Sequence, residues 1–228
     1  IMIINPLNEQ ILPILAESGI RAVTTSVGFP GRIYPLLHEL GMKGLHVLLS
    51  VKHAISAVEA GADGIVAAGS EAGGLRSTGS ESSTMILVPL VCDSVKVPVV
   101  AAGGIADSRG YRAAFALGAQ GVQIGTRFLA ASECPVQDRW KELIVNCEDG
   151  GTSLLPVDNM MMRAILTPEL RAKIESTDFD IKKEFQLKNA SQAWNNGDFS
   201  LVPAGAGQVS ALIHDVKSVA EIINQMVS

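Results

Sequence analysis

The sequence predicts an α/β fold built on a parallel sheet. Short runs rich in Val and Ile alternate with segments of helical periodicity, and many of the 22 glycines stand where those runs end. Aromatic residues make up only 4% of the 228 residues. A core of Val, Ile, Leu and Ala with glycine at the turns is typical of alternating strands and helices. The hydrophobic fraction of 47% suits one sizeable core with a small appendage.

Five segments are predicted to be strands because they are short and β-branched or apolar, as buried parallel strands are. In chain order they are Arg21–Ser26, Gly44–Ser50, Gly64–Gly69, Val97–Gly103 and Gly121–Thr126. The predicted helices between them are Gly31–Leu40, Val51–Ala60, Thr84–Val95 and Ser108–Leu117, the last capped by Asp107. Strict alternation implies right-handed βαβ units, which fits either a doubly wound sheet or a (β/α)8 barrel.

The number of strands bears on the choice between these folds. A closed (β/α)8 barrel has eight strands and typically about 250 residues. Five strands are clear, and Ile1–Ile4 has the character of a sixth, cut short. The sequence also begins without Met. We therefore expect a barrel whose N-terminal strands, about two βα units of roughly 30 residues each, are absent from this sequence.

After Thr126 the pattern changes. Val136–Cys147 is predicted as an amphipathic helix, Glu148–Asn159 as a loop, and Met160–Phe199 as mostly helical. Val209, Ile213 and Val216 begin a helical pattern that continues to the C-terminus. We expect a partial barrel over residues 1–135, a small helical insertion or lid over 136–207, and one helix over 208–228 that returns to the barrel.

Composition excludes several classes of function. The net charge is -5 and no stripe of Lys and Arg is present, so no nucleic-acid partner is expected. No apolar run reaches the roughly 18–20 residues that cross a bilayer. The three cysteines, Cys92, Cys134 and Cys147, fit no zinc or redox spacing. We expect no metal and no membrane partner, and a reducing, cytoplasmic location.

Glycines at two neighbouring strand ends indicate an anion site. Gly103 and Gly104 end one predicted strand, and Gly125 and Thr126 end the next. In parallel α/β folds ligands lie at the carboxyl ends of strands, and exposed backbone N–H groups there favour a phosphate. The alternative is that these glycines only turn the chain.

The third predicted strand ends in a further glycine pair, preceded by a carboxylate. In the run E-A-G-G, Glu71 either orients the loop through backbone N–H groups or acts on a substrate. His46 lies on a predicted strand and could face the barrel interior. Both are weak candidates for catalysis, His46 because histidine titrates near neutral pH.

Together, E-A-G-G, V-P-V-V-A-A-G-G-I-A-D and G-V-Q-I-G-T-R-F-L-A resemble the nitronate monooxygenase (2-nitropropane dioxygenase) family, which includes flavin-dependent enoyl-[acyl-carrier-protein] reductases. The likeness covers essentially the whole chain. It implies a (β/α)8 barrel with non-covalently bound FMN. By position, Gly103 and Gly104 would meet the phosphate, and Gly73 would lie beside the cofactor. The resemblance implies that four further residues hold the phosphate and ribityl chain: Gln123, Ile124, Gly125 and Thr126.

The chain departs from the family pattern where protons would be transferred. The family commonly has His after E-A-G-G, whereas this chain has Leu75, which cannot transfer a proton. Ala68 stands where many members have Gln, and Val47 where some have Lys. These differences concern the groups around the flavin ring more than the phosphate site, and they leave the catalytic residues unknown.

The resemblance implies an FMN-dependent oxidoreductase of the nitronate monooxygenase type, which oxidises alkyl nitronates with O2. The alternative is an enoyl reductase that uses NAD(P)H and an acyl thioester. Two further readings stay open, a flavin-free barrel that binds a phosphorylated metabolite and a non-catalytic flavin binder. The substrate is expected to be a small molecule, and a homodimer is one expected oligomeric state.

Overall fold

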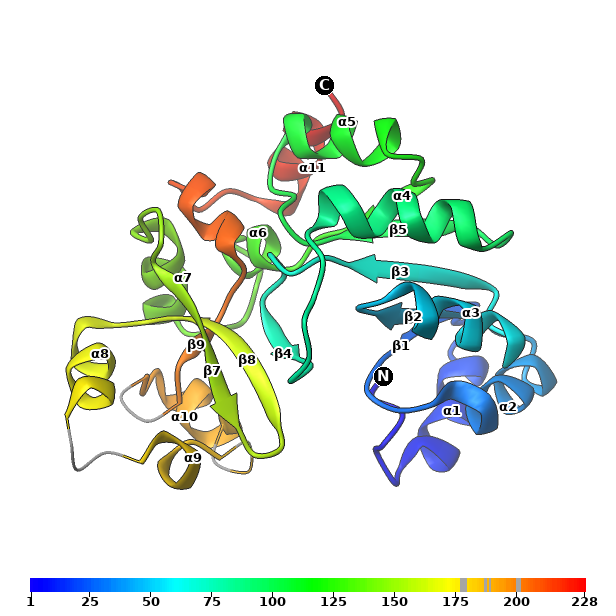
Figure 1. Ribbon diagram of the computed structural model, residues 1–228, viewed down its shortest axis with the longest axis horizontal. Helices are drawn as coiled ribbons and strands as arrows, with labels where there is room; N and C mark the ends of the chain where they lie inside the picture. The colour runs from blue at the N-terminus through cyan, green and yellow to red at the C-terminus, as the bar shows by residue number, and fades with distance from the viewer. Residues whose placement is uncertain (177–179, 187, 189, 200–201) are drawn as a thin grey trace. The chain divides into compact units, whose positions relative to one another are not determined.

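The computed structural model describes residues 1–176, 180–186, 188, 190–199 and 202–228 (Figure 1). The chain forms two compact units that interleave along the sequence. Unit 1 consists of Ile1–Ser70, Glu81–Ala102 and Ala114–Gln123. Unit 2 consists of Glu71–Ser80, Gly103–Ala113 and Ile124–Ser228.

Unit 1 is built on a five-stranded parallel sheet in the order β1-β2-β3-β5-β6. The strands are β1 (Ala22–Thr25), β2 (Lys43–Leu48), β3 (Gly64–Ala68), β5 (Val99–Ala102) and β6 (Gly121–Gln123). Each strand pairs with the one that precedes it in this sheet, without a reversal of order. A doubly wound sheet would reverse its order at a switch point, whereas the wall of a (β/α)8 barrel does not. The α/β class is confirmed, and of the two alternatives the barrel order is the one observed.

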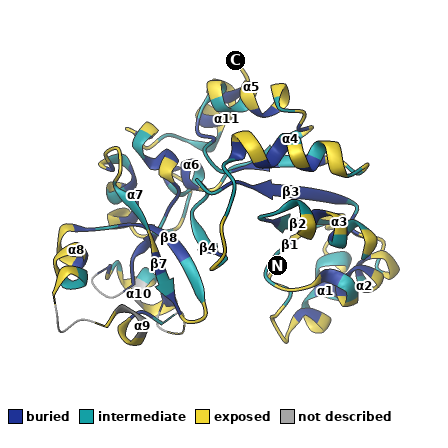
Figure 2. Ribbon diagram, viewed as in Figure 1, coloured by how far each residue is buried: buried dark blue, intermediate teal, exposed yellow. Residues whose placement is uncertain are grey.

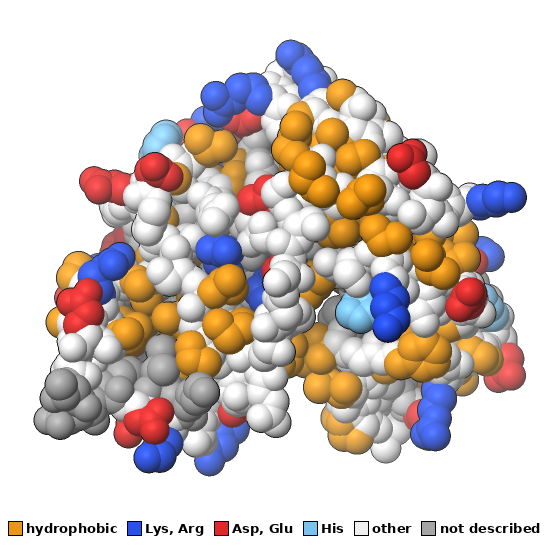
Figure 3. All heavy atoms as spheres, in the orientation of Figure 1, with side chains coloured by type: hydrophobic (Ala, Val, Ile, Leu, Met, Phe, Trp, Pro, Cys, Tyr) orange, Lys and Arg blue, Asp and Glu red, His pale blue; other side chains and the backbone are white. Residues whose placement is uncertain are grey.

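The four predicted helices between strands are observed, and a further helix over Asn8–Glu17, which was not predicted, precedes the first strand. Those of unit 1 are α1 (Asn8–Glu17), α2 (Ile33–Glu39), preceded by a 3-10 turn η1 (Pro30–Arg32), α3 (Val51–Glu59) and α4 (Thr84–Ser94); α5 (Ser108–Ala116) starts in unit 2 and ends in unit 1. All five residues of β3 are buried (Figure 2), and α3 and α4 contact it. The outer face of α4 is apolar (Figure 3), with Met85, Ile86 and Leu90 47–60% exposed.

Unit 2 combines antiparallel strands with short helices. Its sheet has the order β4-β8-β7, with β9 also paired to β8. The strands are β4 (Gly74–Arg76), β7 (Thr152–Val157), β8 (Met160–Ile165) and β9 (Ala204–Gly205). The helices are α6 (Thr126–Leu129), α7 (Asp138–Val145), α8 (Pro168–Glu175), α9 (Ile181–Glu184), α10 (Ala190–Asn196), a 3-10 turn η3 (Gln208–Leu212) and α11 (Val219–Val227).

The predicted loop over Glu148–Asn159 and helix from Met160 are wrong for Thr152–Ile165, which forms the β7–β8 hairpin. Val157 pairs with Met160, so the hairpin loop has two residues, Asp158 and Asn159. Asp158 has a φ of 47°. Tight hairpin turns need positive φ, which Asp and Asn tolerate. The Asp-Asn pair therefore indicates the hairpin turn, but the three methionines that follow it have no strong preference for strand.

The predicted single helix over 208–228 is also wrong in its first half. Gln208–Leu212 is a 3-10 turn, and α11 begins only at Val219. The Ser218 hydroxyl accepts a hydrogen bond from the N–H of Glu221 at 3.2 Å, and the Glu221 carboxylate accepts one from the N–H of Ser218 at 2.9 Å. This capping box starts the helix at that point. The apolar periodicity runs through the break because Val209 and Ile213 are buried in a separate cluster.

Among the described residues, no helix combines the length and the apolar character of a membrane span. The described residues also contain no group of three or more His, Cys, Asp or Glu side chains that could together hold a metal ion.

Candidate functional site

Four glycine-containing turns of unit 2 meet around Gly207. The carbonyl oxygen of Glu71 accepts a hydrogen bond from the N–H of Gln208 at 2.9 Å. The Thr126 hydroxyl accepts one from the N–H of Gly207 at 3.0 Å. A Cβ atom on Gly104 would lie 3.7 Å from Cβ of Glu71. The turns at residues 71–74, 103–104, 125–126 and 205–207 therefore form one group, although 136 positions separate the first residue from the last.

The turn after β5 needs glycine for its backbone conformation. Gly103 and Gly104 have φ values of 93° and 74°, in the left-handed region that other residues avoid. The chain then enters α5, where the Asp107 carboxylate accepts hydrogen bonds from the N–H groups of Arg109 at 2.9 Å and Gly110 at 3.4 Å. The predicted cap is confirmed. The Arg109 guanidinium beside Asp107 also holds the pKa of that carboxyl below its usual range.

The turn after β6 has open space beside its backbone and N–H groups available as hydrogen-bond donors. Gly125 has a φ of -106°, which any residue adopts, and a Cβ atom there would meet nothing within 4 Å. Among the described residues, no acceptor takes the N–H of Gly104, Gly125 or Thr126. Backbone donors without a partner bind water or a ligand. These three amides, on turns of the same group, can therefore donate to an anion.

Gly73 has a different physical reason to be glycine. A Cβ atom at this position would lie 2.4 Å from both the carbonyl carbon of Ala206 and the nitrogen of Gly207. A Cβ atom on Gly207 would in turn lie 2.7 Å from the carbonyl oxygen of Glu71. The two glycines allow the backbones of the two turns to touch. The close approach explains Gly73 by packing, and its predicted position beside the cofactor stays a proposal.

Gly207 was not predicted as a site residue. The G-A-G run at 205–207 is rich in glycine like the other turns. It was predicted to lie between helices, however, and the sequence indicated ligand sites only where glycines follow a strand. Six of the predicted residues belong to unit 2: Gly73, Gly103, Gly104, Ile124, Gly125 and Thr126. Gln123 is the last residue of β6 and belongs to unit 1.

Comparison with known proteins shows the family to which the chain belongs. The family model described as nitronate monooxygenase matches residues 5–228. The chain belongs to the nitronate monooxygenase family. A probable nitronate monooxygenase of Staphylococcus saprophyticus is 34% identical over 230 residues, covering 95% of this chain and 65% of the relative. The chain thus spans less than two thirds of the length of that curated relative.

Solved structures agree with this family assignment. FabK of Thermotoga maritima superimposes with a TM-score of 0.86 at 33% identity, over 100% of this chain and 73% of FabK. A nitroalkane oxidase of Streptomyces ansochromogenes has a TM-score of 0.80 at 24% identity, over 96% of this chain and 66% of the oxidase, and shows a shared fold.

Leu75 lies in a packing position. It is the middle residue of β4, pairs with Met162 of β8, and packs against an apolar cluster that includes Leu155 and Phe185. A leucine here extends the hydrophobic core of the β4-β8-β7 sheet. The departure from the family pattern at this position is therefore accommodated structurally, and it supplies no proton donor.

His46 is placed in unit 1, on the side of the sheet that faces α2. Its Nδ1 is hydrogen-bonded to the Thr25 hydroxyl at 2.9 Å, and Thr25 is hydrogen-bonded to the phenol oxygen of Tyr34, on α2, at 3.0 Å. His46 is 6% exposed, and burial lowers its pKa. This network satisfies a buried neutral imidazole, so the structure gives His46 a structural setting. Thr25 and Tyr34 were not predicted as partners because nothing in the sequence spacing links them.

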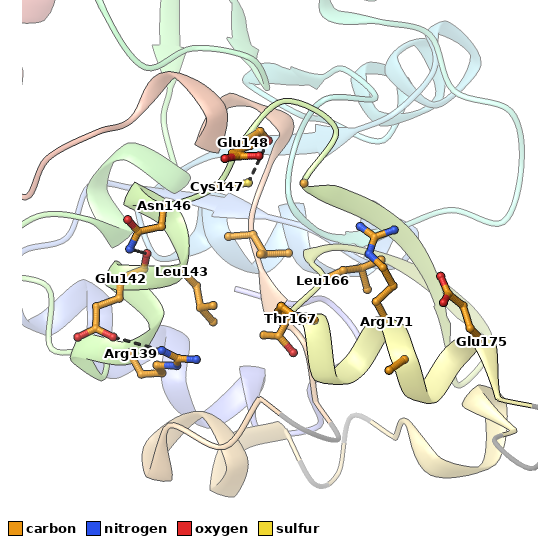
Figure 4. A pocket seen from close by; sticks show the side chains of 14 residues that line it. Arg139, Glu142, Leu143, Asn146, Cys147, Glu148, Leu166, Thr167, Arg171 and Glu175 are labelled. Atoms are coloured by element: carbon orange, nitrogen blue, oxygen red, sulfur yellow. Dashed lines mark hydrogen bonds and ion pairs between the residues drawn. The ribbon is translucent and has the colours of Figure 1, made fainter.

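A separate cavity of about 550 Å³ lies in unit 2 between α7 and α8 (Figure 4). Leu143, Ile165 and Leu166 give it apolar walls, and Arg139 and Arg171 are among its charged residues. The guanidinium of Arg139 contacts the carboxylate of Glu142 at 3.5 Å, drawn as a dashed line in the figure. None of the predicted site residues lines this cavity.

Proposed function

We propose that the glycine turns of unit 2 bind the phosphate of FMN, and that the chain is the flavin-binding part of an oxidoreductase of the nitronate monooxygenase type. The observation that carries the proposal is a set of three amides, on Gly104, Gly125 and Thr126, whose N–H groups no acceptor in the described part of the chain takes. Family membership and the 33% identity to FabK support it.

The residues present fit a phosphate group. The open space beside Gly125 leaves room for phosphate oxygens near the backbone. Backbone amides in such turns bind phosphate through several short hydrogen bonds and need no charged side chain. The hydroxyl of Thr126 accepts from Gly207 and keeps its own proton free to donate.

The surrounding residues hold these donors in place. The Gly73–Gly207 contact and the Glu71–Gln208 hydrogen bond fix the turns against one another, so that binding requires little reorganisation. A bound flavin would supply the redox chemistry that the side chains cannot perform. Glu71, whose side chain lies beside Gly104, stays the carboxylate candidate, and we propose that its main role is to orient the loop.

The enoyl reductase reaction is the second candidate, favoured by the match of the whole chain to FabK. Both reactions would use the same phosphate site. Nitronate substrates are already anionic and need no protein base to remove a proton. The packing of Leu75 therefore favours the nitronate reaction over one that needs a proton donor at that position. A cytoplasmic location and a homodimer stay predictions.

An anaerobic reduction test separates these candidates. The purified chain is loaded with FMN, and its flavin absorbance is followed after addition of NADH, NADPH or an alkyl nitronate. Reduction by the nitronate alone supports the monooxygenase. Reduction by a pyridine nucleotide, with turnover of a crotonyl thioester, supports the enoyl reductase. Bound FMN that no donor reduces indicates a non-catalytic flavin binder, and failure to bind FMN refutes the proposal in favour of a flavin-free barrel.

A further inference from the structure

We propose that Arg127 is a positioning residue for the cofactor phosphate, because it ties the Gly125–Thr126 turn to the chain segment before α11. This inference rests on the proposed function, since it concerns how firmly that phosphate is held. Arg127 does not need to touch the phosphate. It acts through the backbone of the residues that precede it.

The guanidinium of Arg127 is buried, and among the described residues it has one partner, Asp215. Arg127 is 6% exposed. Its Nη1 donates to the carbonyl oxygen of Asp215 at 3.1 Å and contacts the Asp215 carboxylate at 3.1 Å. Its Nη2 is buried and has no hydrogen-bond partner among the described residues. A buried guanidinium is costly unless it is paired, so Asp215 is what keeps this side chain in place.

Further contacts join the residues that follow α6 to the same chain segment at the start of α11. The N–H of Ser132 donates to the carbonyl oxygen of Lys217 at 2.9 Å. The Glu133 carboxylate accepts hydrogen bonds from the N–H of Val219 at 2.9 and 3.0 Å. These contacts hold the region after α6. The Arg127 side chain holds the beginning of α6, one residue after Thr126.

The beginning of α6 has little stability of its own. The helix has four residues, and so short a helix depends on tertiary contacts. Donors that bind an anion must be held within about 0.5 Å of their productive position. Loss of the Arg127 anchor would let the first turn of α6 reorient. The amides of Gly125 and Thr126 would then lose their alignment toward the phosphate.

Geometry, more than charge, is the expected basis of this effect. Asp215 is an anion beside the arginine, and Lys217 contacts the same carboxylate at 2.6 Å. Lysine at position 127 would keep the positive charge, but its shorter side chain lacks the flat guanidinium and would not place its nitrogen where Nη1 contacts both oxygens of Asp215. Asp215→Asn would keep the carbonyl contact, because that oxygen belongs to the backbone, and would have a smaller effect.

The test compares the dissociation constants of FMN and riboflavin, which differ by the phosphate, for wild type, Arg127→Lys and Asp215→Asn. Flavin fluorescence gives both constants. We expect Arg127→Lys to weaken FMN binding roughly tenfold, the lower end of the losses seen when residues that orient metal ligands are replaced. Riboflavin binding should not change. Arg139→Lys, at an exposed Arg139–Glu142 pair, is the matched control and should change neither constant.

Each outcome bears on a different statement. If wild type does not prefer FMN to riboflavin, the proposed phosphate site fails before any variant is considered. If wild type prefers FMN and Arg127→Lys keeps that preference in full, the positioning role is overturned. Equal losses for FMN and riboflavin would also overturn it, because they indicate a general structural defect. If Arg127→Lys does not fold, Asp215→Asn decides: a selective, smaller loss for FMN supports the role, and an unchanged FMN constant overturns it.

Discussion

Replacement of Gly73 by alanine directly perturbs the contact that joins two of the glycine turns. The new Cβ atom would lie 2.4 Å from two backbone atoms of Ala206 and Gly207. Ordinary carbon contacts are near 3.5 Å, so one backbone must move by about 1 Å. Overpacking of this kind costs roughly 1–3 kcal/mol. Strain on the Glu71–Gln208 hydrogen bond adds about 1 kcal/mol, so we expect a loss of about 2–4 kcal/mol.

Urea unfolding followed by tryptophan fluorescence measures this loss in the right place. Both tryptophans, Trp140 and Trp194, belong to unit 2, with ring centroids 5.3 Å apart. Two glycines serve as controls. Gly74→Ala places a side chain at a φ of 78° but in open space, and should cost about 1–2 kcal/mol from strain alone. Gly125→Ala has neither clash nor strain, and should stay within about 0.5 kcal/mol of wild type.

The order of the three variants is the decisive result. The close contact predicts that Gly73→Ala is the least stable, Gly74→Ala intermediate and Gly125→Ala close to wild type. A Gly73→Ala protein as stable as Gly74→Ala would refute the reasoning, because the turns would then have room that the structure does not show.

Three further predictions concern stability. Because burial lowers the pKa of His46, the unfolded chain takes up the proton first, and stability should fall as the pH drops below about 6.5; circular dichroism melts of His46→Gln should lack this part of the slope. Burial alone would raise the pKa of Asp63, but hydrogen bonds led by that from Lys43 lower it. The ionised Asp63 therefore stabilises the fold above about pH 3.9, and this contribution is lost as the pH falls through the lowered pKa of the folded state. Asp63→Asn should reduce the loss of stability at acid pH in the same melts. Ser218→Ala removes the cap of α11 and should cost about 1 kcal/mol in urea unfolding, with an unchanged stability counting against the capping box.

The strand and helix pattern of unit 1 could be predicted from the sequence because its periodicity is strong and its elements are local. Buried parallel strands such as β3 are apolar throughout, and amphipathic helices such as α3 alternate with the strands. The sequential order of the sheet could not be read in this way. Pairing of β1 with β2 or of β3 with β5 is a long-range property, and two topologies fit the same alternation.

The errors in unit 2 have local causes. The methionines of β8 have no strong preference for strand, and the hairpin depends on the positive φ of Asp158. The break before α11 depends on Ser218 and Glu221, whose capping pattern competes with a continuous apolar periodicity. In the candidate site, strand-end glycines were found because each follows an apolar run. Gly207 and Arg127 were missed because their roles come from contacts across 81 and 88 positions of the chain.

Amide chemical shifts of the isotope-labelled protein test the phosphate site most directly. The spectra are recorded with saturating FMN and again with saturating riboflavin, so that any difference reflects the phosphate. We predict that the N–H resonances of Gly104, Gly125 and Thr126 shift strongly with FMN and little with riboflavin, as amides that donate to a phosphate should. Bound FMN that leaves these three resonances where riboflavin leaves them would contradict the account.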